Sequence, residues 1–211
     1  MIRPLDEPRL RADLDRLASI DADVASAMAR IGYPSPRVRD PGFATLLRII
    51  VGQQVSTRSA AAIWARLEQA TEGPPTPDQF LGLDDEALRA VGFSRAKVHY
   101  GRHLAEAVLG ETLALDALHA LDPDAATAQL TALPGFGRWS AEIYLLFALG
   151  HGDIMPADDL ALQVAYERLK GLPARPTAKL LRELTTAWSP VRGAGAVFLW
   201  HYYGAATLDP R

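Results

Sequence analysis

Two adjacent aspartates, Asp158 and Asp159, interrupt the otherwise apolar stretch "GDIMPADDLALQ" at residues 152–163. The pattern that follows them predicts a core-facing helix over about 159–170. A carboxylate near a protein interior costs several kcal/mol unless it is paired or has a task, and a helix N-terminus stabilises negative charge. The pair therefore indicates either carboxylates that only cap a helix or a carboxylate held ready for chemistry. Asp158 could be a solvent-exposed neighbour or the cap itself.

The stretch "LPGFGRWSAEIYLL" at residues 133–146 has the residue types needed to hold a phosphate. Pro134 and Gly135 predict a turn, and Gly137 stands just before a helix expected to begin near Arg138. Glycines let the backbone turn tightly and approach a ligand closely, and amides at a helix N-terminus bind anions. The alternative is a tight helix–helix turn that needs glycine only for its own geometry.

Apolar residues recur at helical spacing almost throughout, and no segment alternates like a half-buried strand. The expected fold class is therefore all-α, with many short helices and short loops. Asp40 is expected to cap the helix after the proline-rich segment, with Pro41 in its first turn, and Ser56 to cap the next helix. The expected helices cover about 7–31 (one long or two short), 43–55, 56–70, 77–82, 84–90, 94–110, 123–131, 138 onward, 159–170, 176–187 and 191–203.

The composition excludes several classes of protein and of binding site. The 211 residues include no cysteine, which excludes disulfides, thiolate zinc sites and cysteine-ligated iron–sulfur clusters. The N-terminus has no signal-peptide pattern and no stretch is long enough to span a bilayer, so a cytoplasmic protein is expected. A net charge of −3 neither indicates nor excludes a nucleic-acid partner. The five histidines form no pattern of metal ligands.

With a helix expected on each side, the segment L-P-G-F-G-R-W-S-A resembles the helix–hairpin–helix motif of the HhH-GPD superfamily of DNA glycosylases. The resemblance is closest to the 3-methyladenine DNA glycosylase II (AlkA-type) branch, in a short form without its N-terminal β domain. Trp139 precedes Asp159 at the spacing expected for that branch. Two further blocks resemble the family in the same order, "LLRIIVGQQVSTRSAAAIWARL" (46–67) and "WSPVRGAGAVFLWHYY" (188–203).

The resemblance implies one HhH-GPD domain over residues 1–211, with two helical lobes flanking a cleft. One lobe would span about 36–150 and contain the hairpin at 133–139. The other would combine about 1–35 with 152–211, which would place Asp159 at the junction of the lobes.

The resemblance also implies roles for individual residues. Asp159 would be the catalytic carboxylate, and Gln54, with Gln53 beside it, would be a wedge that fills the gap left by a flipped base. The alternative for the two glutamines is a buried polar pair that ties two helices together. The expected base pocket is lined by Trp139, Tyr144, Trp200 and Tyr202. For Trp200 and Tyr202 the alternative is ordinary core packing, and the aromatic residue expected four positions after Trp139 is replaced by Ile143.

The hairpin would bind DNA phosphates through Gly135, Phe136, Gly137, Arg138 and Ser140. The resemblance adds a structural sodium or potassium ion on the backbone carbonyls of Thr131, Leu133 and Phe136, and no other cofactor is required. The partner would be duplex DNA containing alkylated bases, bound by a monomer, with no membrane involved.

The implied activity is hydrolytic removal of alkylated bases of the 3-methyladenine and 7-methylguanine type, which leaves an abasic site. Relatives that also cut the strand carry a lysine at the position of Trp139, so a monofunctional enzyme is expected. Three alternatives stay open: a glycosylase for uracil, mismatched thymine or hypoxanthine, a non-catalytic DNA-binding module, and a helical protein–protein adaptor.

Overall fold

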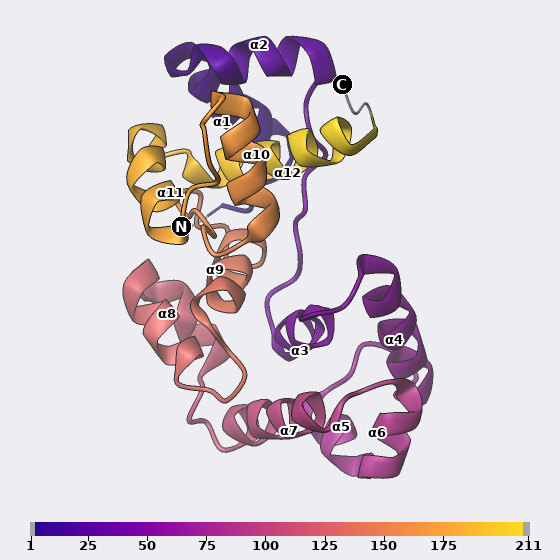
Figure 1. Cartoon of the computed structure of the whole chain (residues 1–211). Coiled ribbons are helices and arrows are strands. Elements are labelled where there is room, and N and C mark those ends of the chain that lie inside the picture. The colour runs from indigo at the N-terminus through magenta and orange to yellow at the C-terminus, as the bar shows by residue number, and fades with distance from the viewer. Residues whose placement is uncertain (1–2, 209–211) are drawn as a thin grey trace. The chain divides into compact units, whose positions relative to one another are not determined.

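The computed structural model describes residues 3–208, and this part of the chain forms helices and no strand (Figure 1). The expected all-α fold class is confirmed. The chain divides into two compact units. The central unit is Arg39–Tyr144, and the terminal unit combines the residues up to Val38 with those from Leu145 on. None of the described helices is both long and apolar enough to cross a bilayer.

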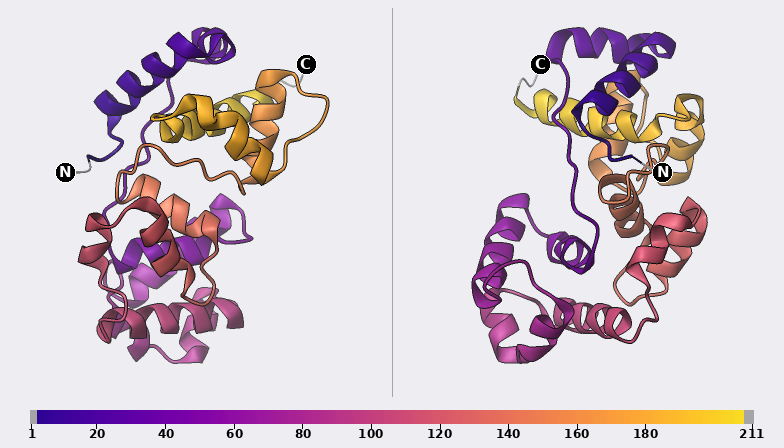
Figure 2. Two further views of the ribbon diagram at one scale, coloured as in Figure 1. Left: turned by 90° about the vertical axis from the view of Figure 1, so that its left-hand side faces the viewer. Right: turned by 180° about the vertical axis from the view of Figure 1, so that it is seen from behind.

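The terminal unit contains both the N-terminal and the C-terminal helices, coloured indigo and yellow in Figure 2. Its longest helix, α12, contacts α1, α2 and α10. Leu10, Leu14 and Leu17 form the buried stripe of α1, at the spacing of one helix face. The elements are α1 (Glu7–Ile20), α2 (Ala22–Ile31), α10 (Leu160–Lys170), α11 (Ala178–Leu184), the 3-10 helix η2 (Thr185–Trp188) and α12 (Arg192–Leu208).

The central unit packs α3 against α4 and α7, and α7 in turn against α5. Six residues of the ten-residue helix α3 are buried, so this helix lies inside the unit. The elements are α3 (Phe43–Gly52), α4 (Thr57–Ala70), α5 (Pro77–Gly82), α6 (Asp85–Val91), α7 (Arg95–Leu109), the 3-10 helix η1 (Leu115–Ala120), α8 (Pro123–Thr131) and α9 (Arg138–Phe147).

The division between the units falls within α9, between Tyr144 and Leu145, whereas the sequence analysis placed it near residue 150. The last turn of α9 belongs to the terminal unit because its side chains pack there. The side chain of Leu146 closely approaches the backbone of Gly193. The ring of Phe147 lies 5.6 Å from that of Trp200.

Three expectations about α3 are wrong. Asp40 does not cap the helix, because α3 begins only at Phe43, after Gly42, and has no side-chain cap. Pro41 therefore lies before the first turn, and Thr45 donates its hydroxyl hydrogen to the Asp40 carbonyl at 2.6 Å. The helix also ends at Gly52 instead of 55. By contrast, the expected cap Ser56 accepts a hydrogen bond from the Ser59 amide at 3.1 Å.

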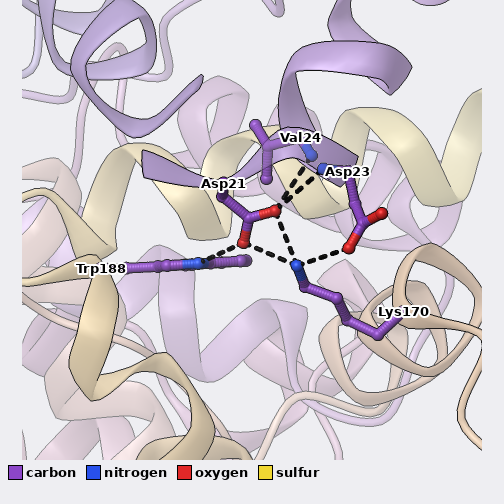
Figure 3. A network of polar contacts seen from close by, with 5 residues as sticks. All are labelled: Asp21, Asp23, Val24, Lys170 and Trp188. Atoms are coloured by element: carbon purple, nitrogen blue, oxygen red, sulfur yellow. Dashed lines mark hydrogen bonds and ion pairs between the residues drawn. The ribbon is translucent and has the colours of Figure 1, made fainter. Parts of the chain in front are cut away.

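Residues 7–31 form two helices because Asp21 breaks the pattern and caps α2 through hydrogen bonds from the amides of Asp23 and Val24. The same carboxylate accepts hydrogen bonds from Lys170 Nζ at 2.6 and 2.7 Å and from Trp188 Nε1 at 2.8 Å (Figure 3). It therefore joins α2 to the end of α10 and to η2. Only 8% of Asp21 is exposed, so its charge depends on these partners.

The network stabilises the charged forms of both Asp21 and Lys170. Burial raises the pKa of Asp21, but hydrogen bonds from Lys170, Trp188 and Val24 outweigh it, so the pKa lies below the usual 3.8. Burial lowers the pKa of Lys170, but Asp21 and Asp23 outweigh it, so the pKa lies above 10.5. The stabilisation from Asp21 is thus present above pH 3.8 and is lost as the pH falls through its folded-state pKa. That from Lys170 is present below pH 10.5 and is lost as the pH rises through its folded-state pKa.

We expect Asp21→Asn to lower the free energy of unfolding by about 2–3 kcal/mol, because asparagine keeps the cap but leaves the Lys170 ammonium without its main partner. Asp6→Asn is a matched control in the same unit, since Asp6 caps α1 through the Arg9 amide; it should change stability by about 0.5 kcal/mol or less. Urea unfolding at pH 7 measures both. The deficit of Asp21→Asn should shrink as the pH falls below 3.8. Equal effects of the two variants would contradict the assigned role of the ion pair.

Candidate functional site

Asp159 is the N-cap of α10. Its Oδ1 accepts hydrogen bonds from the amides of Ala161 at 2.9 Å and Leu162 at 3.3 Å. Two amide donors and the helix dipole therefore act on this carboxylate. The expectation that the aspartate pair caps the helix is thus met by Asp159.

Asp158 is not the cap. Its side chain is exposed and forms an ion pair with Arg182 of α11. The neighbouring loop is also fixed, because Gln163 Nε2 donates to the Ala157 carbonyl at 2.8 Å and the Asp159 amide to the Pro156 carbonyl at 2.9 Å. These contacts restrict the backbone that carries Asp159.

Upstream, the same loop is held by the N-terminus of α12. The Asp153 carboxylate accepts hydrogen bonds from Arg192 at 2.7 and 3.0 Å and from the Ser189 hydroxyl at 2.7 Å. Burial raises the pKa of Asp153, but these donors outweigh it and the pKa lies below the usual 3.8. The Gly193 amide donates to the Gly152 carbonyl at 2.8 Å. The loop before Asp159 is therefore fixed at both ends.

Trp200 and Tyr202, both expected in the base pocket, are partly exposed on α12. Trp200 contacts Phe147, and the guanidinium carbon of Arg37 lies 5.3 Å from its ring centroid. This is a cation–π contact, so the ring of Trp200 already binds one planar cation. Tyr202 stacks on Phe198 of its own helix, with ring centroids 6.2 Å apart.

Arg37 is a residue that the sequence analysis missed. Desolvation by the surrounding protein lowers the pKa of its guanidinium, and the Asp159 carboxylate raises it in part. The clamps made by Arg182 and Arg192 were likewise not predicted from the sequence. All three arginines act on partners far away in the sequence, so no local pattern marks them.

The hairpin between α8 and α9 belongs to the central unit. Its turn is closed by a hydrogen bond from the Phe136 amide to the Leu133 carbonyl at 3.1 Å, and the Phe136 side chain is buried. Gly135 has φ 82°, and a Cβ there would lie 2.3 Å from ring atoms of Tyr100. Only glycine fits this position, on both conformational and steric grounds.

Gly137 is different, because a Cβ at this position would meet no atom within 4 Å. The fold itself therefore does not need glycine here, and the open space leaves room for a ligand. Arg138, the first residue of α9, pairs its Nε with Oε1 of Glu142 at 2.8 Å within the same helix. Its charge is thus partly balanced before any phosphate approaches.

Three expected site residues make contacts inside the protein. Gln53 Nε2 donates to the Gly135 carbonyl at 2.9 Å and to Ser140 Oγ at 3.1 Å. Ser140 is buried, and its hydroxyl takes part in that contact. Tyr144 does not line an open pocket, because it is fully buried and its hydroxyl oxygen accepts a hydrogen bond from the Gly42 amide at 2.9 Å.

Gln54, by contrast, is exposed, and its backbone adopts the left-handed conformation with φ 55°. Non-glycine residues in this conformation are uncommon and concentrate at functional sites. Trp139 is partly exposed near the start of α9. The central unit therefore carries Gln54, the hairpin and Trp139, and the terminal unit carries Asp159, Arg37, Trp200 and Tyr202.

The model of the HhH-GPD superfamily of base excision DNA repair proteins matches residues 47–190. Among curated proteins, DNA-3-methyladenine glycosylase 1 of Schizosaccharomyces pombe is 33% identical over 74% of this chain and 69% of its own length. DNA-3-methyladenine glycosylase 2 of Escherichia coli is 29% identical over 92% of this chain and 71% of its own.

Solved structures of 3-methyladenine glycosylases also resemble this chain. That of 3-methyladenine DNA glycosylase from Schizosaccharomyces pombe in complex with abasic DNA has a TM-score of 0.85 at 28% identity and covers 94% of this chain and 98% of its own. A DNA-3-methyladenine glycosidase from Bacillus halodurans has a TM-score of 0.79 at 29% identity, and the match covers 99% of this chain and 95% of that one. Because the family model spans more than half of its residues, this chain belongs to the HhH-GPD superfamily of base excision DNA repair proteins.

Proposed function

We propose that this protein is a monofunctional DNA glycosylase that flips alkylated bases of the 3-methyladenine and 7-methylguanine type out of duplex DNA and hydrolyses their N-glycosidic bonds. The observation that carries the proposal is the carboxylate of Asp159, held by two amides at the N-terminus of α10 in a chain of this family. Several relatives and solved neighbours are named 3-methyladenine glycosylases. The alkylated-base specificity is our extension from those proteins to this one.

Asp159 would stabilise the positive charge that develops on the sugar as the glycosidic bond breaks, and would position the attacking water. Such a group must be ionised and immobile. The cap contacts hold the carboxylate of Asp159, and the clamps on Asp153 and Asp158 restrict its backbone. Preorganisation of this kind is what electrostatic catalysis requires.

A base alkylated on a ring nitrogen carries positive charge, and such a cation stacks well on an electron-rich ring. Trp200 is suited to this task, because its ring already binds the guanidinium of Arg37. Tyr202 and, in the central unit, Trp139 stay predictions for the same role.

The hairpin would hold the phosphate backbone beside the lesion. First-turn amides of a helix lack intrahelical acceptors and bind anions, and α9 begins directly after the open position at Gly137. Gln54 would enter the stack in place of the flipped base, since it is the exposed one of the two glutamines. Duplex DNA is the proposed partner, bound by a monomer.

A sodium or potassium ion at the hairpin is a further proposal, based on the donor set. Thr131 is the last residue of α8, so its carbonyl has no intrahelical partner. The Leu133 carbonyl accepts one hydrogen bond, from the Phe136 amide, and has a second lone pair. With the Phe136 carbonyl these are neutral oxygen donors that suit an alkali ion. Within residues 3–208 no cluster of His, Asp and Glu forms a metal site.

We expect purified protein to release 3-methyladenine from duplex DNA treated with a methylating agent, measured by chromatography without added cofactor. Asp159→Asn should lower the single-turnover rate by about 10²- to 10³-fold while asparagine preserves the helix cap. Asp84→Asn is the matched control and should retain most of the activity, because Asp84 caps α6 through the Ala87 amide at 2.8 Å and lies outside the proposed site. Equal release by the two variants would rule out the catalytic role of Asp159.

Absence of strand cleavage is a separate expectation. None of the three lysines lies in the hairpin, and Trp139 stands where lyase relatives carry theirs. Borohydride added during the reaction should therefore trap no covalent protein–DNA complex, because no Schiff base forms. A trapped complex would show that the enzyme is bifunctional.

Substitutions at the two hairpin glycines should separate folding from DNA binding. Gly135→Ala should lower the melting temperature, because φ 82° and the Tyr100 ring exclude a Cβ. Gly137→Ala should lower the melting temperature far less, because its Cβ meets no atom within 4 Å, but should weaken duplex binding by obstructing the phosphate. Thermal denaturation and fluorescence anisotropy measure these effects. Unchanged DNA affinity of Gly137→Ala would argue against the hairpin as the phosphate site.

A further inference from the structure

The side chain of Gln53 joins two segments that are 82 positions apart in the sequence. Gln53 is the C-cap residue of α3 and immediately precedes Gln54. Its Nε2 reaches across to the hairpin, where it donates to the Gly135 carbonyl at 2.9 Å and to Ser140 Oγ at 3.1 Å. The turn at residues 52–55, which we call the wedge turn, is thus tied directly to the hairpin.

Both acceptors are themselves fixed. Gly135 lies against the ring of Tyr100, and only 3% of Ser140 is exposed. A hydrogen bond to a fixed partner transmits position, whereas one to a mobile partner does not. The Gln53 amide therefore holds the wedge turn at a defined place relative to the hairpin.

Helix α7 contacts both the end of α3 and the hairpin. Lys97 Nζ donates to the Val51 carbonyl in the last turn of α3 at 2.8 Å, and burial lowers the pKa of this ammonium. Tyr100, three residues later on the same helix, covers Gly135. Residues three apart share a helix face, so one face of α7 contacts both the end of α3 and the hairpin.

The backbone of Gln54 needs such support. Its φ of 55° lies in the left-handed region, which is costly for a residue with a Cβ. A strained conformation of this kind persists only where the surrounding structure holds it. The contacts of Gln53 and Lys97 are the side-chain hydrogen bonds that fix the residues before it.

We propose that Gln53 is a positioning residue that couples the wedge Gln54 to the phosphate-binding hairpin. When the hairpin binds the DNA backbone, Gln54 is then already placed to enter the base stack. This inference rests on the proposed role of Gln54. Without the Gln53 amide the wedge turn would sample other conformations, and a bound duplex would be opened less often.

The test uses a duplex with 2-aminopurine beside a tetrahydrofuran abasic analogue, whose fluorescence rises when the stack is opened. It is read at saturating protein, so that affinity does not enter the amplitude. Gln54→Ala should abolish most of the rise. Gln53→Met keeps the side-chain length but cannot donate, and should lower the opened population by about tenfold.

A double-mutant cycle separates coupling from an independent effect. If Gln53 acts only through Gln54, the double variant Gln53→Met/Gln54→Ala should match Gln54→Ala alone. Ser140→Ala removes one of the two acceptors and should give a smaller loss than Gln53→Met. It also keeps the test available should Gln53→Met fail to fold.

Gln79→Met is the matched control for general destabilisation. Gln79 lies in the same unit, donates to the Thr71 carbonyl at 3.1 Å and accepts from the Thr76 amide at 3.0 Å. Its loss should lower the melting temperature much as Gln53→Met does, but should leave the fluorescence amplitude at the wild-type value.

The outcomes distinguish the two proposals. If Gln54→Ala leaves the amplitude unchanged, the wedge assignment itself is wrong and the coupling falls with it. If Gln54→Ala lowers the amplitude but Gln53→Met does not, or if their losses add in the double variant, the coupling is overturned while the wedge stands. Equal losses from Gln53→Met and Gln79→Met would also overturn it.

Discussion

Two backbone amides at the start of α10 hold the carboxylate of Asp159, and much of the terminal unit serves to keep that helix start in place. A carboxylate needs hydrogen-bond donors wherever water is scarce, and a helix N-terminus supplies them. The loop that leads to it is fixed by the ion pair of Asp153 with Arg192 of α12 and by that of Asp158 with Arg182 of α11. Further along α10, Lys170 ties the end of the helix to Asp21 and so to α2.

The central unit contains the hairpin, whose turn includes two glycines. The turn at Gly135 depends on a conformation and a clearance that only glycine provides, while Gly137 leaves space open. The polar side chains nearby mostly serve this geometry: the amide of Gln53 and the hydroxyl of Ser140 bond each other, and the hydroxyl of Tyr144 accepts from Gly42. A net charge of −3 is compatible with phosphate binding of this kind, because backbone amides carry no net charge.

Several of these contacts share a physical cause. The motifs predict DNA or base contacts for Gln53, Ser140 and Tyr144, and in the structure each contacts a partner 82, 87 or 102 positions away. Asp40 was assigned as a cap from the proline after it, but the chain stays outside the helix until Phe43. Polar residue types show that a group needs a partner; they do not show whether that partner is a ligand or the protein itself.

The sequence by itself determined the helical class, most helix positions and the cap Ser56, because periodicity and capping act over a few residues. It also determined the family, since the three motif blocks follow in order. Only the tertiary structure decided which aspartate caps α10, which glutamine is exposed and which glycine is required by its neighbours. It also revealed Arg37 over Trp200 and the clamps by Arg182 and Arg192. These features depend on contacts between remote segments, which no local pattern encodes.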